Sequence, residues 1–162
     1  MNVRENTIAI LVNNKPDVLA RIAGTFSGRG FNIESISANV TMHPDVTKII
    51  ITTIGDQDTV TKLEKQLNKI VDVLEVKDLT DVASAQREMI LIRMKMTHAN
   101  REQVKQTVDT YHWKIVSTDA DCWILEVTGD RQEIDSALSV LEPMGLDDFT
   151  RTGIVALEQC KS

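Results

Sequence analysis

The chain has 162 residues, of which 42% are hydrophobic and 26% are charged, and its net charge is −6. This length allows one ordinary domain or two small ones, and the composition is that of a globular protein. The acidic balance disfavours non-specific binding to nucleic acid or to an anionic membrane surface. The apolar runs are far shorter than the ~20 residues that span a bilayer, and the N-terminal residues lack a signal-peptide core. Because no signal-peptide core is present, we expect a cytoplasmic protein. The two cysteines are too few for a disulfide framework.

The first half of the chain predicts the order β-α-β-β-α-β. Pro16 suits the first position of a helix, where its missing N–H is no loss, and Gly28 and Gly30 suit the end of that helix. Apolar residues three and four apart indicate helices, whereas alternation of apolar and polar residues indicates strands. The expected elements are strands at 7–12, 35–40, 46–54 and 74–77, with helices at 16–28 and 60–70.

The second half repeats this order after a polar segment, 81–88, which we expect to be a linker. Asn100 followed by Gln103 resembles a capping box, and Asp130 is suited to the N-cap of a later helix. The acidic pair Asp147–Asp148 is expected to flank a turn. The expected elements are strands at 90–96, 113–117, 122–128 and 154–157, with helices at 100–111 and 130–141.

These patterns predict an α+β fold of two tandem ferredoxin-like β-α-β-β-α-β units. The repeat is one of pattern and not of residue identity. Each sheet is expected to carry two helices on one face, and a unit of ~75 residues has a small core. We therefore expect the other face and the open edge strands to pair with the neighbouring unit or with a second copy of the chain.

No set of residues has the spacing of an active site. The glycines at 24, 28 and 30 lie late in a helix, so they do not form a dinucleotide-binding loop. The three histidines lie apart from any carboxylate or thiolate at metal-binding spacing. The turn before the first helix is different, because free N–H groups at a helix N-terminus can hold a small anion such as an amino-acid carboxylate. These features favour a small-molecule sensor over a catalyst.

Two further pairs of residues carry expectations of their own. Arg21 and Arg29 lie away from the apolar face of the first helix and are expected to be solvated charges. Trp113 and Trp123 are expected to pack within the second unit, and an exposed tryptophan that anchors a partner is the alternative.

Three segments carry a resemblance to a known family. NNKPDVLARIAGTFSGRGFNIESISANVT, TTIGD and KQLNKIVDVLEVKDLT together resemble the regulatory (small) subunit of acetolactate synthase, also called acetohydroxyacid synthase. The resemblance is close over residues 6–80, and the second half, which begins REMILIRMKM, fits the family in length and element order. It implies an ACT domain for amino-acid sensing and dimerisation at 1–80, a linker at 81–88 and a C-terminal ferredoxin-like regulatory domain at 89–162.

The resemblance also implies a non-catalytic chain that holds no cofactor or metal itself. Such subunits bind a separate catalytic (large) subunit, which is expected to use thiamine diphosphate, Mg and FAD to make 2-acetolactate from pyruvate. They raise its activity and confer feedback inhibition by valine or a related branched-chain amino acid. In the family the ACT domains form a homodimer, and effector sites lie at that interface. A free-standing amino-acid sensor that controls another protein is the main alternative, and a small enzyme on this scaffold is a third.

The family's effector site maps onto two separate segments of this sequence. Main-chain N–H groups of the first helical turn would receive the effector carboxylate, aided by the helix dipole. Two asparagine amides, which both donate and accept, suit its charged groups, and apolar side chains suit its branched tail. The positions are Asn14, Asp17, Val18 and Leu19 in one chain, with Asn32 and Ile33 of the other chain across the interface.

Asp17 departs from the family pattern, which commonly has glycine at this position. Glycine lets a ligand approach the main chain closely, whereas aspartate adds bulk and a negative charge. Two like charges ~4 Å apart at an effective dielectric of ~20 repel by ~4 kcal/mol before screening. We therefore expect valine to bind weakly or in an altered pose.

Overall fold

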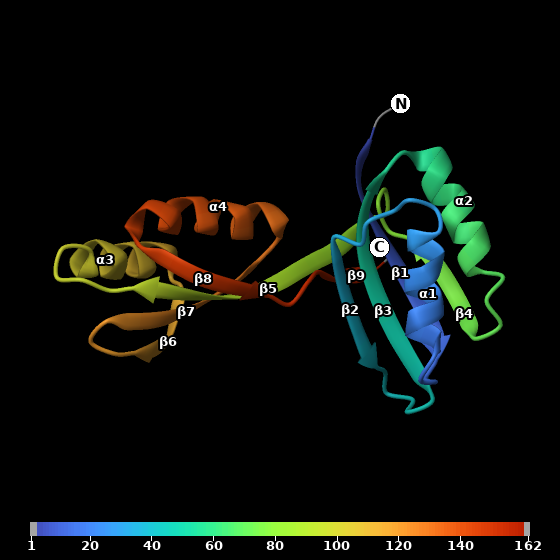
Figure 1. Cartoon of the computed structure of the whole chain (residues 1–162), viewed down its shortest axis with the longest axis horizontal. Helices are drawn as coiled ribbons and strands as arrows, with labels where there is room; N and C mark the ends of the chain where they lie inside the picture. The colour runs from blue at the N-terminus through green and yellow to red at the C-terminus, as the bar shows by residue number, and fades with distance from the viewer. Residues whose placement is uncertain (1–2, 161–162) are drawn as a thin grey trace. The chain divides into compact units, whose positions relative to one another are not determined.

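The computed structural model describes residues 3–160 (Figure 1). The chain forms two compact units, one built from residues up to Ala85 together with those from Ile154, the other from Gln86–Gly153. Each unit has a four-stranded antiparallel arrangement with two helices, and one further strand follows the second unit. The predicted α+β fold of two tandem β-α-β-β-α-β units is confirmed.

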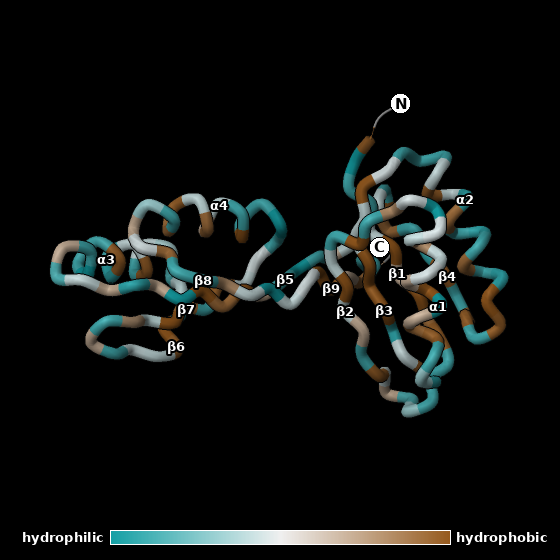
Figure 2. The backbone as a smooth tube through the Cα atoms, in the orientation of Figure 1, coloured by the Kyte–Doolittle hydropathy of each residue, from teal (hydrophilic) through white to brown (hydrophobic). Residues whose placement is uncertain are grey.

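The first unit contains a sheet with the strand order β2-β3-β1-β4. Strand β1 lies in the middle and pairs with β3 along its whole length, from Arg4 opposite Gly55 to Asn13 opposite Val46. Figure 2 shows how strongly apolar residues concentrate on these central strands. The elements are β1 (Arg4–Asn13), α1 (Val18–Ser27), β2 (Ser35–Val40), β3 (Val46–Gly55), α2 (Gln57–Leu67) and β4 (Val73–Asp78).

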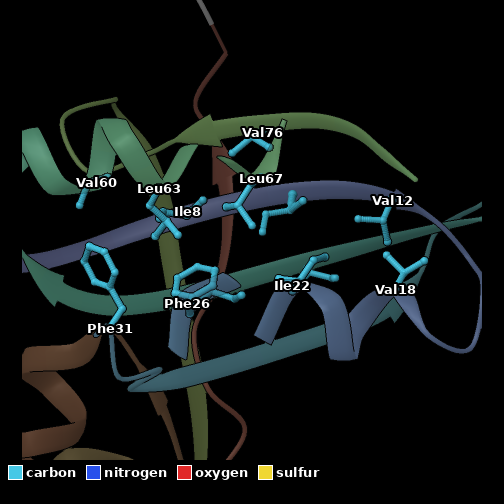
Figure 3. Packing of buried hydrophobic residues seen from close by; sticks show 13 residues of the cluster. Ile8, Val12, Val18, Ile22, Phe26, Phe31, Val60, Leu63, Leu67 and Val76 are labelled. Atoms are coloured by element: carbon cyan, nitrogen blue, oxygen red, sulfur yellow. The ribbon is translucent and has the colours of Figure 1, made fainter. Parts of the chain in front are cut away.

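Helices α1 and α2 cover one face of this sheet. Side chains alternate between the faces of a strand, so every second residue of β1 and β3 points toward the helices. Each isoleucine, leucine or phenylalanine that is fully buried there contributes about 1.5–3 kcal/mol. Figure 3 shows Val12 and Val18 next to each other at the end where α1 begins. The core consists mainly of Ile8, Ile10, Val12, Val18, Ile22, Phe26, Ile49, Ile51, Val60, Leu63 and Leu67.

Helix α1 begins later than the sequence predicts. Asp17 is its N-cap and Val18 its first residue, so the prediction that Pro16 occupies the first helical position is wrong. The turn before the helix is fixed by other bonds, because the Lys15 amide donates to Asn13 O at 2.9 Å and the Val18 amide to Lys15 O at 3.3 Å. The end of the helix agrees with prediction, with Gly28 as the C-cap.

The second unit has the strand order β6-β7-β5-β8. Its helices also cover one face, over a core that includes Ile90, Ile92 and Met94 of the central strand. Trp123 is buried in this core and Trp113 packs against it, as predicted. The elements are β5 (Ser84–Lys95), α3 (Arg101–Tyr111), β6 (Lys114–Thr118), β7 (Cys122–Gly129), α4 (Arg131–Leu141), the short 3₁₀ helix η1 (Glu142–Met144) and β8 (Leu146–Arg151).

The last strand of the second unit lies earlier than predicted. It is β8, so Asp147 and Asp148 belong to a strand and do not flank a turn. Both carboxylates lie beside Arg93 of β5, with Nε to Asp147 Oδ2 at 2.7 Å and Nη2 to Asp148 Oδ2 at 3.4 Å. Gly145 reverses the chain before β8 with a φ of 105°, a left-handed conformation that glycine adopts without a steric penalty. This cross-strand ion pairing is invisible in the local pattern of the sequence.

One of the two predicted capping motifs of the second unit forms. Asp130 and Glu133 make a full capping box at the start of α4, as expected of an aspartate before a helix. Asn100 does not cap α3, so the predicted box with Gln103 is wrong. Its side chain instead donates to Lys95 O and Met144 O, both at 2.8 Å, and accepts from the Thr97 amide.

The segment predicted as a linker and the C-terminal segment both contribute strands. Strand β5 already begins at Ser84, so 84–88 is extended sheet and not an irregular linker. Strand β9 (Val155–Glu158) pairs with β5, and residues from Ile154 belong to the first unit, not to the second as the predicted boundaries have it. Ala156 is buried on the face of the first sheet that the helices leave open, against Ala9, Ile50 and Leu79.

Replacing Ala156 with aspartate should destabilise the first unit. Ala156 is 5% exposed, and an unpaired carboxylate buried there would cost about 2 kcal/mol or more. Urea unfolding of A156D should show a lower midpoint than that of the wild type. The control is V155D on the same strand, whose side chain is 49% exposed. Equal midpoints for the two variants would contradict the packing of β9 on this sheet.

Candidate functional site

A cavity of about 410 Å³ lies at the N-terminal end of α1. Strand β1 ends at this point, the chain turns through 14–16, and α1 starts, while β2 and β3 form the opposite wall. The cavity therefore combines a helix N-terminus with the apolar ends of strands, an arrangement suited to a small molecule with one charged and one apolar end. Its lining consists of Val12, Asn13, Asn14, Lys15, Pro16, Val18, Leu19, Ala38, Val40, Thr47 and Ile49.

Three of the six predicted effector residues lie around this cavity. Asn14, Val18 and Leu19 line it, and Asp17 adjoins them at the N-cap of α1. The other two follow the opposite end of α1, because they precede β2. Asn32 is exposed and its carbonyl accepts from Thr53 Oγ1 at 2.6 Å, while Ile33 is half-buried against the core. Within one chain, the predicted effector residues therefore lie at opposite ends of α1 and do not form one site.

The turn that carries Asn14 is anchored to the β2–β3 turn. The Asn14 amide donates to Asp45 O at 2.8 Å, and the side-chain Nδ2 donates to Pro44 O at 3.0 Å. These bonds join two loops that both lie at one end of the sheet. They give the wall of the cavity a defined position before any ligand binds.

Asp72, between α2 and β4, anchors the same turn from the other side. Its side chain is 8% exposed and accepts from Asn13 Nδ2 at 3.1 Å and from Lys15 Nζ at 2.7 Å. It also pairs with the guanidinium of Arg21 on α1. The hydrogen bonds from Lys15, Arg21 and Asn13 hold the pKa of Asp72 far below its usual range. The prediction that Arg21 is only a solvated charge is therefore wrong, since tertiary structure brings Asp72 to it.

The N-terminus of α1 carries no side-chain cap. Asp17 makes no hydrogen bond to the first-turn amides, and the first turn contains no acidic residue. Among the described residues, no acidic side chain of α1 bonds to the N–H groups of its first turn, and of these the Val18 amide donates to Lys15 O at 3.3 Å. An aligned helix dipole and open N–H groups are the features that favour binding of a carboxylate.

An apolar strip borders the cavity along the edge of the sheet. Strand β2 pairs with β3 on one side only, so its other edge has no strand among the described residues of this chain. Ile36 and Val40 point to the same face as the core, since they pair with Ile51 and Thr47, yet they stay 38% and 56% exposed. The alternation correctly predicts the strand, but its apolar side is left uncovered. We call Leu19, Ile36, Ala38 and Val40 the edge strip.

The second unit does not repeat this site. Its corresponding turn before α3 is filled by the Asn100 side chain, which bonds to main-chain groups on both sides. A larger cavity of about 620 Å³ lies elsewhere, between the Tyr111–Trp113 stack and α4. The helix N-terminus beside it is already capped by Asp130 and Glu133. The N-terminus of α4 is therefore not available to bind the carboxylate of a ligand in this larger cavity.

The described residues show neither a metal cluster nor a membrane helix. Across residues 3–160, no three or more histidine, cysteine, aspartate or glutamate side chains are grouped so as to hold a metal ion. None of the described helices combines the length and apolarity needed to cross a bilayer.

Comparison with known proteins identifies the family. Residues 8–75 match the AHAS small subunit-like ACT domain, and residues 87–160 match the family described as the small subunit of acetolactate synthase. The chain belongs to the acetolactate synthase small-subunit family. The two matches divide the sequence in the same order as the predicted ACT and C-terminal domains.

Individual members of the small-subunit family match along most of their length. A probable acetolactate synthase small subunit of Archaeoglobus fulgidus is 37% identical over 94% of this chain and 96% of its own length. The acetolactate synthase small subunit of Aquifex aeolicus is 35% identical over 97% of this chain and 82% of its own. The crystal structure of the small subunit from Thermotoga maritima is similar, with a TM-score of 0.88 and 31% identity over 98% of this chain and 99% of that one.

Sequence reasoning missed several residues of the site. The alternating pattern places Ala38 and Val40 in a strand, but it does not show that their exposed apolar side borders the cavity. The pairing of Arg21 with Asp72 was also missed, since the two residues are far apart along the chain and no local pattern links them. In the sequence, the one signal for these residues is the alternation of apolar residues in β2. That alternation points to a site only once the structure shows that the apolar side of β2 stays exposed.

Asp72 should make the folded state sensitive to acid. Its partners lower its folded pKa below the value of roughly 3.9 of an unfolded aspartate, so the folded state binds fewer protons. The stabilisation is therefore present above about pH 5 and is lost as the pH falls. We expect D72N to be less stable than the wild type at neutral pH, with a difference that narrows in acid, measured by urea unfolding.

The matched control is D109N, which removes an exposed carboxylate from α3. The stability of D109N in urea unfolding should differ little from that of the wild type, both at neutral pH and in acid. A difference between D72N and wild type that stays constant down to about pH 3 would mean that the charge of Asp72 is not what stabilises the turn.

Proposed function

We propose that this chain is the regulatory subunit of acetolactate synthase, which activates the thiamine-diphosphate-dependent catalytic subunit and mediates feedback control by valine or a related branched-chain amino acid. Family membership over nearly the whole chain supports the assignment. The observation that carries the sensing role is the open N-terminus of α1 beside an apolar cavity. We expect this chain to supply no catalytic residue, with thiamine diphosphate, Mg and FAD bound by the catalytic partner.

The edge strip is the surface through which two ACT domains pair. An antiparallel pairing of β2 with β2 of a second copy would satisfy the unpaired strand edge and cover Ile36 and Val40. Such pairing about a two-fold axis places the start of each β2 opposite the end of the other. The end of β2, at Val40, borders the cavity, so the start of the second copy's β2 would arrive at the same place.

This arrangement reunites the predicted effector residues. Asn32 and Ile33 precede β2, so in the dimer those of one copy lie near the Asn14 turn of the other. The α1 amides then receive the effector carboxylate, the two asparagines bind its polar groups, and Leu19 with Ile33 surrounds the branched tail. Each site needs residues of two chains, which explains why one chain presents only half of it.

Binding at a shared site can regulate a partner without any chemistry in this chain. An effector that contacts both copies binds best to one arrangement of the dimer and shifts the population toward it. The catalytic subunit responds if its own affinity or activity differs between the arrangements. The strength of regulation is then limited by the differential affinity of the effector for those states.

Mixing the chain with the catalytic subunit should raise acetolactate formation, and valine should reverse part of that increase. The rate is measured colorimetrically with pyruvate, thiamine diphosphate, Mg and FAD, with and without this chain. Affinity capture from cells provides the control for partner identity and should recover a thiamine-dependent enzyme. Capture of a different target, together with no rate increase, would favour the free-standing sensor.

Replacing Val40 with aspartate should weaken the dimer. The variant places an unpaired charge in the covered apolar strip of each copy, opposite the start of the other copy's β2, and burying it there is unfavourable. We expect the dimer dissociation constant from analytical ultracentrifugation to rise at least about tenfold, a change of about 1.4 kcal/mol. The control is V116D, which changes an apolar residue of edge strand β6 that is 51% exposed. An unchanged dimer in V40D would remove β2 from the interface.

A further inference from the structure

Asp17 behaves unlike the other aspartates that begin helices in this chain. Asp56 and Asp130 both have extended main-chain angles and accept the amide of the third helical residue at 2.8 Å, as capping residues do. Asp17 holds the same position before α1, but its φ and ψ of −94° and −8° are helical and its carboxylate caps nothing. A residue type that normally closes a helix N-terminus leaves this one open.

The carboxylate of Asp17 is turned toward Arg21, one turn further along α1. The Arg21 Nε lies 3.0 Å from Asp17 Oδ2. Helix N–H groups point toward the N-terminus, so a carboxylate held at the position four residues later is displaced from them. The positive charge of Arg21 also partly neutralises the negative charge that Asp17 places beside the cavity.

Arg21 is itself held in place by a buried group. Its guanidinium pairs with Asp72, which is 8% exposed, whereas Asp17 is 68% exposed. The hydrogen bond with Asp72 is the main cause that raises the pKa of Arg21, followed among the attractive causes by the charge of Asp17. The order of anchoring is therefore Asp72, then Arg21, then Asp17, from the buried side of the cluster to the solvent.

We propose that Arg21 is a positioning residue for the effector site, which holds the Asp17 carboxylate away from the amides of α1 and so limits its repulsion of the effector carboxylate. This inference rests on the proposed function, because it concerns the affinity of that same site. It explains how this chain keeps an open helix N-terminus although an aspartate stands at the N-cap position of α1. Arg21 acts through Asp17 and does not itself contact the effector.

A double-mutant cycle over positions 17 and 21 tests the proposal. Valine, leucine and isoleucine are titrated calorimetrically into the wild-type chain, R21M, D17G and the D17G/R21M double variant. With Asp17 present, loss of Arg21 frees the carboxylate to approach or cap the α1 amides, and affinity should fall about fivefold or more. In the D17G background no carboxylate is released, so R21M should change affinity less than about twofold. D17G alone should bind somewhat more tightly than the wild type.

Arg29 provides the matched control, since R29M removes the same charge from an exposed position just after α1. It should leave affinity within about twofold. Thermal unfolding of every variant reports whether Arg21 acts only by stabilising the fold, in which case D17G would not rescue the affinity of R21M. Rescue by D17G supports the positioning role, and equal effects of R21M in both backgrounds overturn it. Absence of binding in all variants, D17G included, would instead overturn the proposed amino-acid site itself.

Discussion

The organisation of the site depends on the hydrogen bonds and ion pairs of the buried Asp72 carboxylate. It lies between α2 and β4, yet its partners come from the end of β1, from the turn that follows and from α1. A nearly buried charge is costly unless it is paired and hydrogen-bonded, so these three donors are tied to it as a set. This cluster fixes the conformation of the β1–α1 turn, and residues of that turn line the cavity.

The two units show how one topology yields different sites through the chemistry of its helix ends. In the first unit the N-terminus of α1 is left open, because Asp17 is drawn toward Arg21. In the second unit a capping box closes α4, whereas α3 has no side-chain cap and the Asn100 side chain fills the turn before it. Helix N-termini attract carboxylates in every protein, so a selective site requires that most of them be satisfied internally. The sensing role we propose for the first unit fits this contrast.

The first sheet also illustrates how a small unit manages its exposed surfaces. Two helices cover one face, and the C-terminal strand β9 places Ala156 on the other, where the apolar patch is small. The edge strip remains, since no described element of the chain adds to β2. Leaving this edge open is unfavourable for an isolated chain, and pairing with a second copy removes exposed apolar surface and unpaired main-chain groups together. The dimer and the sensing site that we propose thus both depend on the same unpaired edge of β2.

By itself the sequence determined the element order, the fold class and the family. The periodicity of apolar residues gives strands and helices because it reflects which face is buried, and the segment around Asn14 is specific enough to indicate an ACT domain. Asp130 as a cap was also foreseeable, since capping depends on residues three apart. Long-range pairing decided the rest. Asp147 and Asp148 lie in β8, where they pair with Arg93 of β5, and Ala156 packs on the face of the first sheet that the helices leave open. Arg21 meets Asp72 because the fold brings α1 next to the α2–β4 connection, and ion pairs between such distant residues leave no trace in local sequence pattern.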